Sequence, residues 1–65
     1  MSKTAIFHEM ADGRGGDLGA TIEIVLSHVE ALKRLDAATL VLLQGGNGVY
    51  VRESVDDVRR EVEAQ

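Results

Sequence analysis

Residues 39–58 read TLVLLQGGNGVYVRESVDDV, and this stretch decides the fold. Its centre, Gly45-Gly46-Asn47-Gly48, is the strongest turn signal in the chain, because glycine and asparagine tolerate the left-handed backbone that hairpin turns require. An apolar run of strand length, residues 38–44, precedes the turn. Residues 49–52 follow it with β-branched and aromatic side chains, which favour strands. The stretch therefore predicts a β-hairpin.

A helix is expected to follow the hairpin directly. Ser54 is a typical N-cap residue, whose hydroxyl can accept a hydrogen bond from the N–H of Asp57. The acidic residues after Ser54 also suit the positive end of a helix dipole. Three valines recur at helical spacing and form one apolar stripe: Val55, Val58 and Val62. The opposite face offers two charge pairs four residues apart, Asp56–Arg60 and Arg59–Glu63.

The N-terminal half predicts two further strands. Residues 5–10 contain β-branched and aromatic side chains, and residues 21–26 carry apolar side chains at every second position. Between them lie residues 12–19, in which four glycines fall within the seven positions 13–19. Glycine permits positive φ and gives the backbone high conformational entropy, so this segment predicts a turn or a mobile Gly-rich loop.

The segment from Ser27 to Asp36 has two interpretations. Ser27 and Glu30 fit a capping box, which favours a helical turn at 27–30 and then an extended strand near 31–36. Apolar residues three apart also suit a helix over 28–36, which is the competing prediction.

Together these elements predict a single α+β domain over residues 1–65: a small antiparallel β-sheet of about four strands with one C-terminal helix packed across a face. The expected core is aliphatic, because only Phe7 and Tyr50 are aromatic. It comprises Ile6, Ile22, Ile24, Leu26, Leu32, Leu40, Leu42, Val49, Val51, Val55, Val58 and Val62.

Composition narrows the function classes. A chain of 65 residues has a thin core and usually needs disulfides, a metal or oligomerisation. The absence of cysteine excludes disulfides and cysteine-based zinc sites, which leaves homodimer formation as the expected support. The net charge of −4 disfavours nucleic acid as a ligand. No 18-residue apolar stretch or signal peptide is present, so we expect a cytoplasmic protein without a membrane span.

The sequence offers little for catalysis. His8 and Glu9 are adjacent, so in a strand their side chains point to opposite faces, and with His28 they do not predict a metal site. The Gly-rich segment lacks the Gly-Lys-Ser/Thr ending of a phosphate-binding loop. Asp56 and Asp57 are explained as residues of the helix N-terminus after Ser54. Glu30 is explained as a member of the capping box. We expect neither enzyme activity nor a cofactor.

Binding to a partner protein is the remaining class. Arg14, at the centre of the Gly-rich segment, is the kind of exposed loop residue that contacts partners. Tyr50 and Arg52 are two apart and are expected on one face of the hairpin. Either Val49–Arg52 or Ala5–Met10 is predicted to form a free strand edge, available for a homodimer or for strand addition by a partner.

Residues 39–58 also resemble the FlbD/SwrD-type small flagellar and swarming-motility proteins, with Val51-Arg52-Glu53-Ser54-Val55-Asp56 as the most specific element. Residues 23–30 are similar to that family's second strand and the turn after it. The chain departs from the family in its Gly-rich segment, where the family has a tight first turn, and in lacking proline. The resemblance implies a bacterial cytoplasmic accessory protein that acts on motility machinery through protein contacts.

Two function classes follow. The first is a non-catalytic protein-interaction accessory, linked to bacterial flagellar motility if the resemblance reflects homology. The second is a phage- or plasmid-encoded regulator or inhibitor that binds a host protein or nucleic-acid machinery, because small acidic proteins can occupy basic surfaces.

Overall fold

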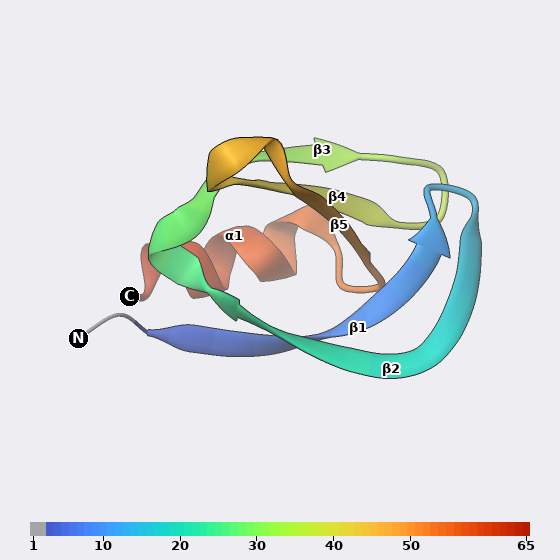
Figure 1. Ribbon diagram of the computed structural model, residues 1–65, viewed down its shortest axis with the longest axis horizontal. Helices are drawn as coiled ribbons and strands as arrows, with labels where there is room; N and C mark the ends of the chain where they lie inside the picture. The colour runs from blue at the N-terminus through green and yellow to red at the C-terminus, as the bar shows by residue number, and fades with distance from the viewer. Residues whose placement is uncertain (1–2) are drawn as a thin grey trace.

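The computed structural model describes residues 3–65, which form one five-stranded antiparallel sheet and one helix (Figure 1). The strand order is β2-β1-β5-β4-β3. The elements are β1 Thr4–Asp12, β2 Gly15–Val25, η1 Leu26–His28, β3 Val29–Arg34, β4 Thr39–Leu43, η2 Gln44–Gly46, β5 Gly48–Val51 and α1 Val55–Glu63. The predicted α+β class is confirmed, with five strands where about four were expected.

The Gly-rich segment corrects the prediction of a mobile loop over residues 12–19, because only Gly13 and Arg14 form a turn and the other residues belong to β1 and β2. Asp12 pairs with Gly15, so β1 and β2 are joined by a tight turn of two residues, Gly13 and Arg14. The backbone at Gly15, Gly16 and Gly19 has positive φ angles of 113°, 88° and 68°. Glycine adopts these angles without steric cost, so here the glycines sit within a strand, and β2 curves strongly beside β1 (Figure 1).

The segment after β2 contains a short helical turn and then a strand. A helical turn is present as predicted, but the 3-10 turn η1 ends at His28 and not at residue 30, and Glu30 belongs to β3. The N-cap is Val25 without a side-chain cap, so the capping box of Ser27 and Glu30 is wrong. β3 pairs with β4, from Val29 opposite Leu43 to Arg34 opposite Thr39. This pairing confirms the strand and overturns the competing helix over 28–36.

The hairpin predicted at residues 38–52 is confirmed as β4–η2–β5. The N–H of Leu43 donates to the C=O of Asn47 at 2.8 Å and closes the turn. Gly45 and Gly46 have φ angles of 84° and 81°, which is the left-handed conformation that the sequence anticipated.

The predicted free edges are wrong. β5, which includes most of Val49–Arg52, lies between β4 and β1, and β1, which includes Ala5–Met10, lies between β5 and β2. The β1–β5 junction is short, with Glu9 opposite Val51 and the N–H of Arg52 donating to the C=O of His8 at 2.8 Å. The two outermost strands are β2 and β3.

The C-terminal helix begins as predicted. The Ser54 hydroxyl accepts a hydrogen bond from the N–H of Asp57 at 3.1 Å. The charge pairs differ from the prediction, because they join residues three apart and not four: Arg59–Asp56 at 2.6 Å and Arg60–Asp57 at 3.3 Å. Residues three apart and residues four apart both lie close together on a helix surface. The two arginines contact the aspartates of the first helical turn from the next turn.

The core lies between the inner face of the sheet and α1. Of the predicted residues, Ile24, Leu26, Val51 and Val58 are buried, and Ile22, Leu32, Val49 and Val62 pack against them. Val55 is only half-buried.

Two strands present the opposite face to the one predicted. In β1, Phe7 is 2% exposed and Ile6 is 64% exposed. In β4, Val41 is fully buried, whereas Leu40 and Leu42 face outward. Both segments carry apolar side chains on consecutive positions, so their alternation did not reveal which face is inside.

Candidate functional site

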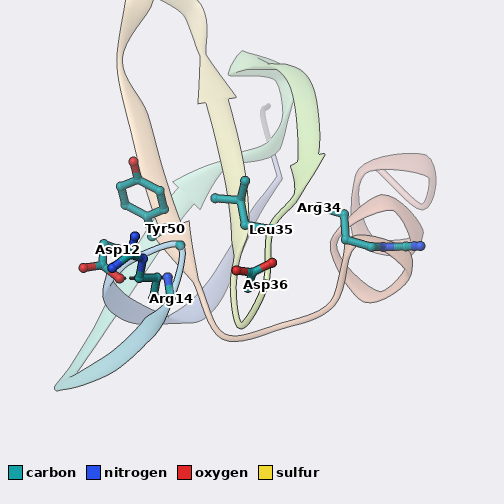
Figure 2. A pocket seen from close by; sticks show the side chains of 7 residues that line it. Asp12, Arg14, Arg34, Leu35, Asp36 and Tyr50 are labelled. Atoms are coloured by element: carbon teal, nitrogen blue, oxygen red, sulfur yellow. Dashed lines mark hydrogen bonds between the residues drawn. The ribbon is translucent and has the colours of Figure 1, made fainter.

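An open depression lies where the β1–β2 turn meets the loop between β3 and β4, with Tyr50 of β5 on one side (Figure 2). Its volume is about 500 Å³. Seven residues line this site, which we name the Arg14 depression: Asp12, Gly13, Arg14, Arg34, Leu35, Asp36 and Tyr50.

Two backbone contacts fix the rim of the Arg14 depression. The N–H of Ala37 donates to the C=O of Gly13 at 2.9 Å, which ties the β3–β4 loop to the β1–β2 turn. A Cβ atom at Gly13 would lie only 2.7 Å from Cδ1 of Leu35, so the two segments approach as closely as glycine allows. The turn that carries Arg14 is therefore held against the neighbouring loop.

Arg14 is presented with its charge unpaired. Its backbone N–H donates to Oδ1 of Asp12 at 2.8 Å, which shapes the turn. Within residues 3–65 its guanidinium takes part in no ion pair. Figure 2 shows the Tyr50 ring beside Asp12 and Arg14, while the Arg34 side chain extends away from them. The depression thus combines the unpaired guanidinium of Arg14 with the half-buried ring of Tyr50 and the partly buried side chain of Leu35.

The three residues predicted to bind a partner are only partly brought together. Arg14 and Tyr50 share the depression, but Arg52 does not line it. The Arg52 guanidinium instead contacts Oδ2 of Asp17 on β2 at 3.3 Å. Strand pairing turns Tyr50 toward the outer face of the sheet, opposite Leu40. Arg52 lies beyond the end of β5, so the spacing of two no longer places both side chains on one strand face.

The sequence missed the contribution of the β3–β4 loop. Leu35 and Asp36 line the depression from that loop, and Asp12 lines it from the end of β1. No motif marks these residues, because their proximity to Arg14 depends on how two distant turns pack. The pair Asp36-Ala37 between two apolar strands was the available signal for a turn.

A second polar cluster joins β1 to the segment before α1. The carboxylate of Glu53 accepts hydrogen bonds from the backbone N–H of His8 at 3.0 Å and 3.3 Å, and its Oε2 lies 2.8 Å from Nδ1 of the same histidine. No local pattern indicates that these two residues pair, because they are 45 positions apart. Neither His8 nor Glu53 lines the Arg14 depression.

The environment of Glu53 lowers its pKa. Partial burial favours the neutral acid and works to raise the pKa of this carboxyl group. Hydrogen bonds from the His8 ring, the His8 N–H and the backbone N–H of Glu53, together with the charge of a protonated His8, outweigh burial. The net pKa of Glu53 lies below its ordinary value of 4.5. The ionised carboxylate is thus the form that the fold favours.

Groups that could hold a metal are not assembled in the described part of the chain. Residues 3–65 contain no cluster of three or more His, Cys, Asp or Glu side chains placed around a common point. His28 is exposed on η1, and His8 is engaged by Glu53. No helix formed by these residues is long and apolar enough to cross a membrane.

Comparisons with known proteins identify no relative of this chain. No family model, no curated protein and no solved structure matches the chain.

Proposed function

We propose that this protein is a small non-catalytic interaction accessory that binds a partner protein through the Arg14 depression. The observation that carries the proposal is the unpaired guanidinium of Arg14, held on a two-residue turn beside the ring of Tyr50. Arginine and tyrosine are enriched among the residues that dominate the energy of protein interfaces. A shallow, open site of mixed charge suits a loop or side chain of another protein better than an enclosed small substrate.

The chemistry of the partner follows from the charges. The positive charge of Arg14 favours binding of a carboxylate, and its planar guanidinium can donate hydrogen bonds to both oxygens of that group. Asp12 and Asp36 on the rim disfavour a uniformly acidic partner surface. The partner segment is therefore proposed to place a single acidic side chain against Arg14 and an apolar or aromatic group over Tyr50 and Leu35.

A link to bacterial flagellar motility is part of the proposal. It rests on the resemblance of residues 39–58 to the FlbD/SwrD-type proteins, in which a hairpin strand leads into the last helix at a serine. Two features are consistent with that resemblance: the cap at Ser54, and the tight β1–β2 turn, which removes one of the two departures noted in the sequence.

Site-specific photocrosslinking in the native host tests the proposal. A photoreactive amino acid is placed at Tyr50 and, in a second strain, at Glu63, which is exposed at the end of α1. We expect one protein to be captured from position 50 and not from position 63. We also expect the variant Arg14→Glu to lose that product, because removing one interface anchor and adding repulsion weakens binding by about tenfold or more.

The matched control is Arg60→Glu, which makes the same charge change on the exposed face of α1. It should leave the crosslink intact. Identical capture from positions 50 and 63, or an unchanged product in Arg14→Glu, would refute binding at the depression. Soft-agar motility of a deletion strain tests the motility link separately, because binding can be retained when swimming is unaffected.

A further inference from the structure

β3 is an unprotected edge of the sheet. It pairs only with β4, and residues 3–65 place no strand against its other side. The N–H of Leu35 donates to the C=O of Ala38 at 3.0 Å, so Leu35 belongs to the residues that hydrogen bond across this hairpin. Hydrogen-bonded and outward-facing residues alternate along an antiparallel strand. The backbone groups of Leu32 and Arg34 therefore point away from β4 and can bond to another strand.

An apolar groove accompanies this edge. It lies between β3 and α1 and has a volume of about 330 Å³. The apolar stripe of α1 is incompletely covered, because Val58 is fully buried while Val55 and Val62 remain half-exposed in the groove. The groove is lined by Val29, Glu30, Ala31, Leu32, Val55, Arg59 and Val62.

The charges along β3 identify the strand that fits. Glu30 and Arg34 lie two residues before and two residues after Leu32, with opposite charge. Neither takes part in an ion pair within the described residues. If two β3 strands pair antiparallel about Leu32, each Glu30 lies opposite the Arg34 of the other copy, and the two Leu32 residues lie opposite each other.

We propose that this chain forms a homodimer in which two β3 strands pair antiparallel, centred on Leu32. The two-fold axis is then perpendicular to the sheet and makes the contact self-complementary. In this register the numbers of two opposing residues, one from each copy, differ by an even number. Their side chains therefore lie on the same face of the joined sheet. Both β3–α1 grooves lie on the same side of the joined sheet, where each covers the other.

The neighbouring register, centred on Lys33, is less favourable. Pairing centred on Lys33 places two lysines opposite each other and brings Glu30 opposite Asp36 of the second copy. Like charges directly opposite destabilise a strand pair. Charged residues on an edge strand usually block association. In the register centred on Leu32, however, the two-fold axis places Glu30 of each copy opposite Arg34 of the other, so opposite charges meet at two places. Glu30 lies at the register shift between β3 and β4, at the rim of the groove.

This interface does not use Arg14 or Tyr50, but Arg34 also lines the Arg14 depression. Glu30 lies outside that depression, so Glu30→Arg is the variant that separates the dimer from the proposed binding of a partner. The interface also replaces the dimer edges predicted from the sequence, because those segments lie inside the sheet. The thin core of a 65-residue chain without cysteine is the kind that association stabilises.

Charge reversal with rescue tests the register. Glu30→Arg and Arg34→Glu each place like charges opposite across the two-fold axis, twice per dimer. We expect each to raise the dimer dissociation constant by about tenfold or more in sedimentation equilibrium. The double variant restores opposite charges and should return to the wild-type constant. Four residues along a strand span about 13 Å, so rescue cannot arise from an ion pair within one chain.

Glu61→Arg, an exposed reversal on α1 away from β3, is the control and should leave the dimer unchanged. Amide hydrogen exchange gives a second reading, because the N–H groups of Leu32 and Arg34 should be protected in the wild-type protein and exchange rapidly in Glu30→Arg. A wild-type monomer at millimolar concentration, single variants with the wild-type dissociation constant, or a folded double variant without rescue would each overturn the proposal. So would fast exchange of both amides in the wild-type dimer.

Discussion

The backbone N–H of His8 is bonded by a side chain and not by a neighbouring strand. β1 reaches β5 through one residue pair, Glu9 with Val51, and its register with β2 shifts between His8 and Met10. The Glu53 carboxylate accepts the His8 N–H at this point, in the place of a strand carbonyl. A hydrogen bond to a charged acceptor contributes about 1.5–3 kcal/mol, which is large for a short junction.

The lowered pKa of Glu53 makes this junction sensitive to acid. Because its pKa is lower in the folded than in the unfolded state, Glu53 contributes stability above the ordinary value of 4.5, and that contribution is lost as the pH falls through the folded-state pKa. We expect Glu53→Gln to lower the free energy of unfolding at neutral pH by about 1–3 kcal/mol. The variant should also lose less stability than the wild type between about pH 5 and pH 3.

Urea unfolding at three pH values measures both effects. Glu61→Gln is the control, because Glu61 is exposed and makes no ion pair within the described residues. If Glu53→Gln and the wild type lost the same stability on acidification, the His8–Glu53 contact would not be the acid-sensitive group.

The β1–β2 turn is positioned by its contact with the β3–β4 loop, and this contact can be tested through Gly13. A methyl group at Gly13 would lie 2.7 Å from Cδ1 and 3.2 Å from Cβ of Leu35. The φ angle of Gly13 is not positive, so the clash is the only reason for strain. We expect Gly13→Ala to lower the free energy of unfolding by about 1–3 kcal/mol, as overpacking does.

A double-mutant cycle separates this clash from a general effect on the turn. Leu35→Ala removes Cδ1, the atom that the new methyl group would meet most closely, and Cγ, but keeps Cβ. Gly13→Ala should therefore cost less in that background, with a coupling of about 0.5 kcal/mol or more. Thermal unfolding of the four proteins gives the coupling. Strictly additive effects would mean that the turn and the loop do not restrain each other, and that Arg14 is held less firmly than the structure implies.

Most elements could be predicted from local signals, and the errors have a common cause. The hairpin at residues 45–48 and the cap at Ser54 are local features, so the sequence was sufficient for them. The faces of β1 and β4 were assigned wrongly, because Ile6 and Phe7 are both apolar and the run around Val41 lacks alternation. Which of two apolar faces is inside depends on where α1 packs, and that contact is not encoded locally.

The same reasoning explains how the glycines and the candidate site were interpreted. Residues 12–19 read as a loop because glycine is common in turns, yet there it allows a paired strand to curve. Arg14 and Tyr50 were predicted as partner-binding residues, but their proximity, and the separation of Arg52, depend on strand order. Strand order is a property of the whole sheet, so residue spacing alone was insufficient.

At the scale of the molecule, one buried cluster joins six of the eight elements, and β3 packs against it through Val29 and Leu32. The buried cluster takes residues from β1, β2, η1, β4, β5 and α1, so no element has a separate core. A domain of this size is expected to have a stability of about 3–10 kcal/mol and to unfold cooperatively. A single core defect should therefore be felt in every strand, including the turn that carries Arg14 and the edge at Leu32.

Val58 tests this dependence most directly. It is 0% exposed at the centre of the contact between α1 and the sheet, so Val58→Asp would bury a charge without a partner. Burying this charge costs several kcal/mol, about as much as the free energy of unfolding of the whole domain. We therefore expect the variant to be unfolded at 25 °C, as measured by circular dichroism and by the loss of amide dispersion in NMR spectra. Val55→Asp makes the same substitution in the first turn, where an acid suits the helix dipole and the side chain is half-buried. It should keep a cooperative melting transition, whereas a native transition in Val58→Asp would mean that α1 does not hold the sheet together.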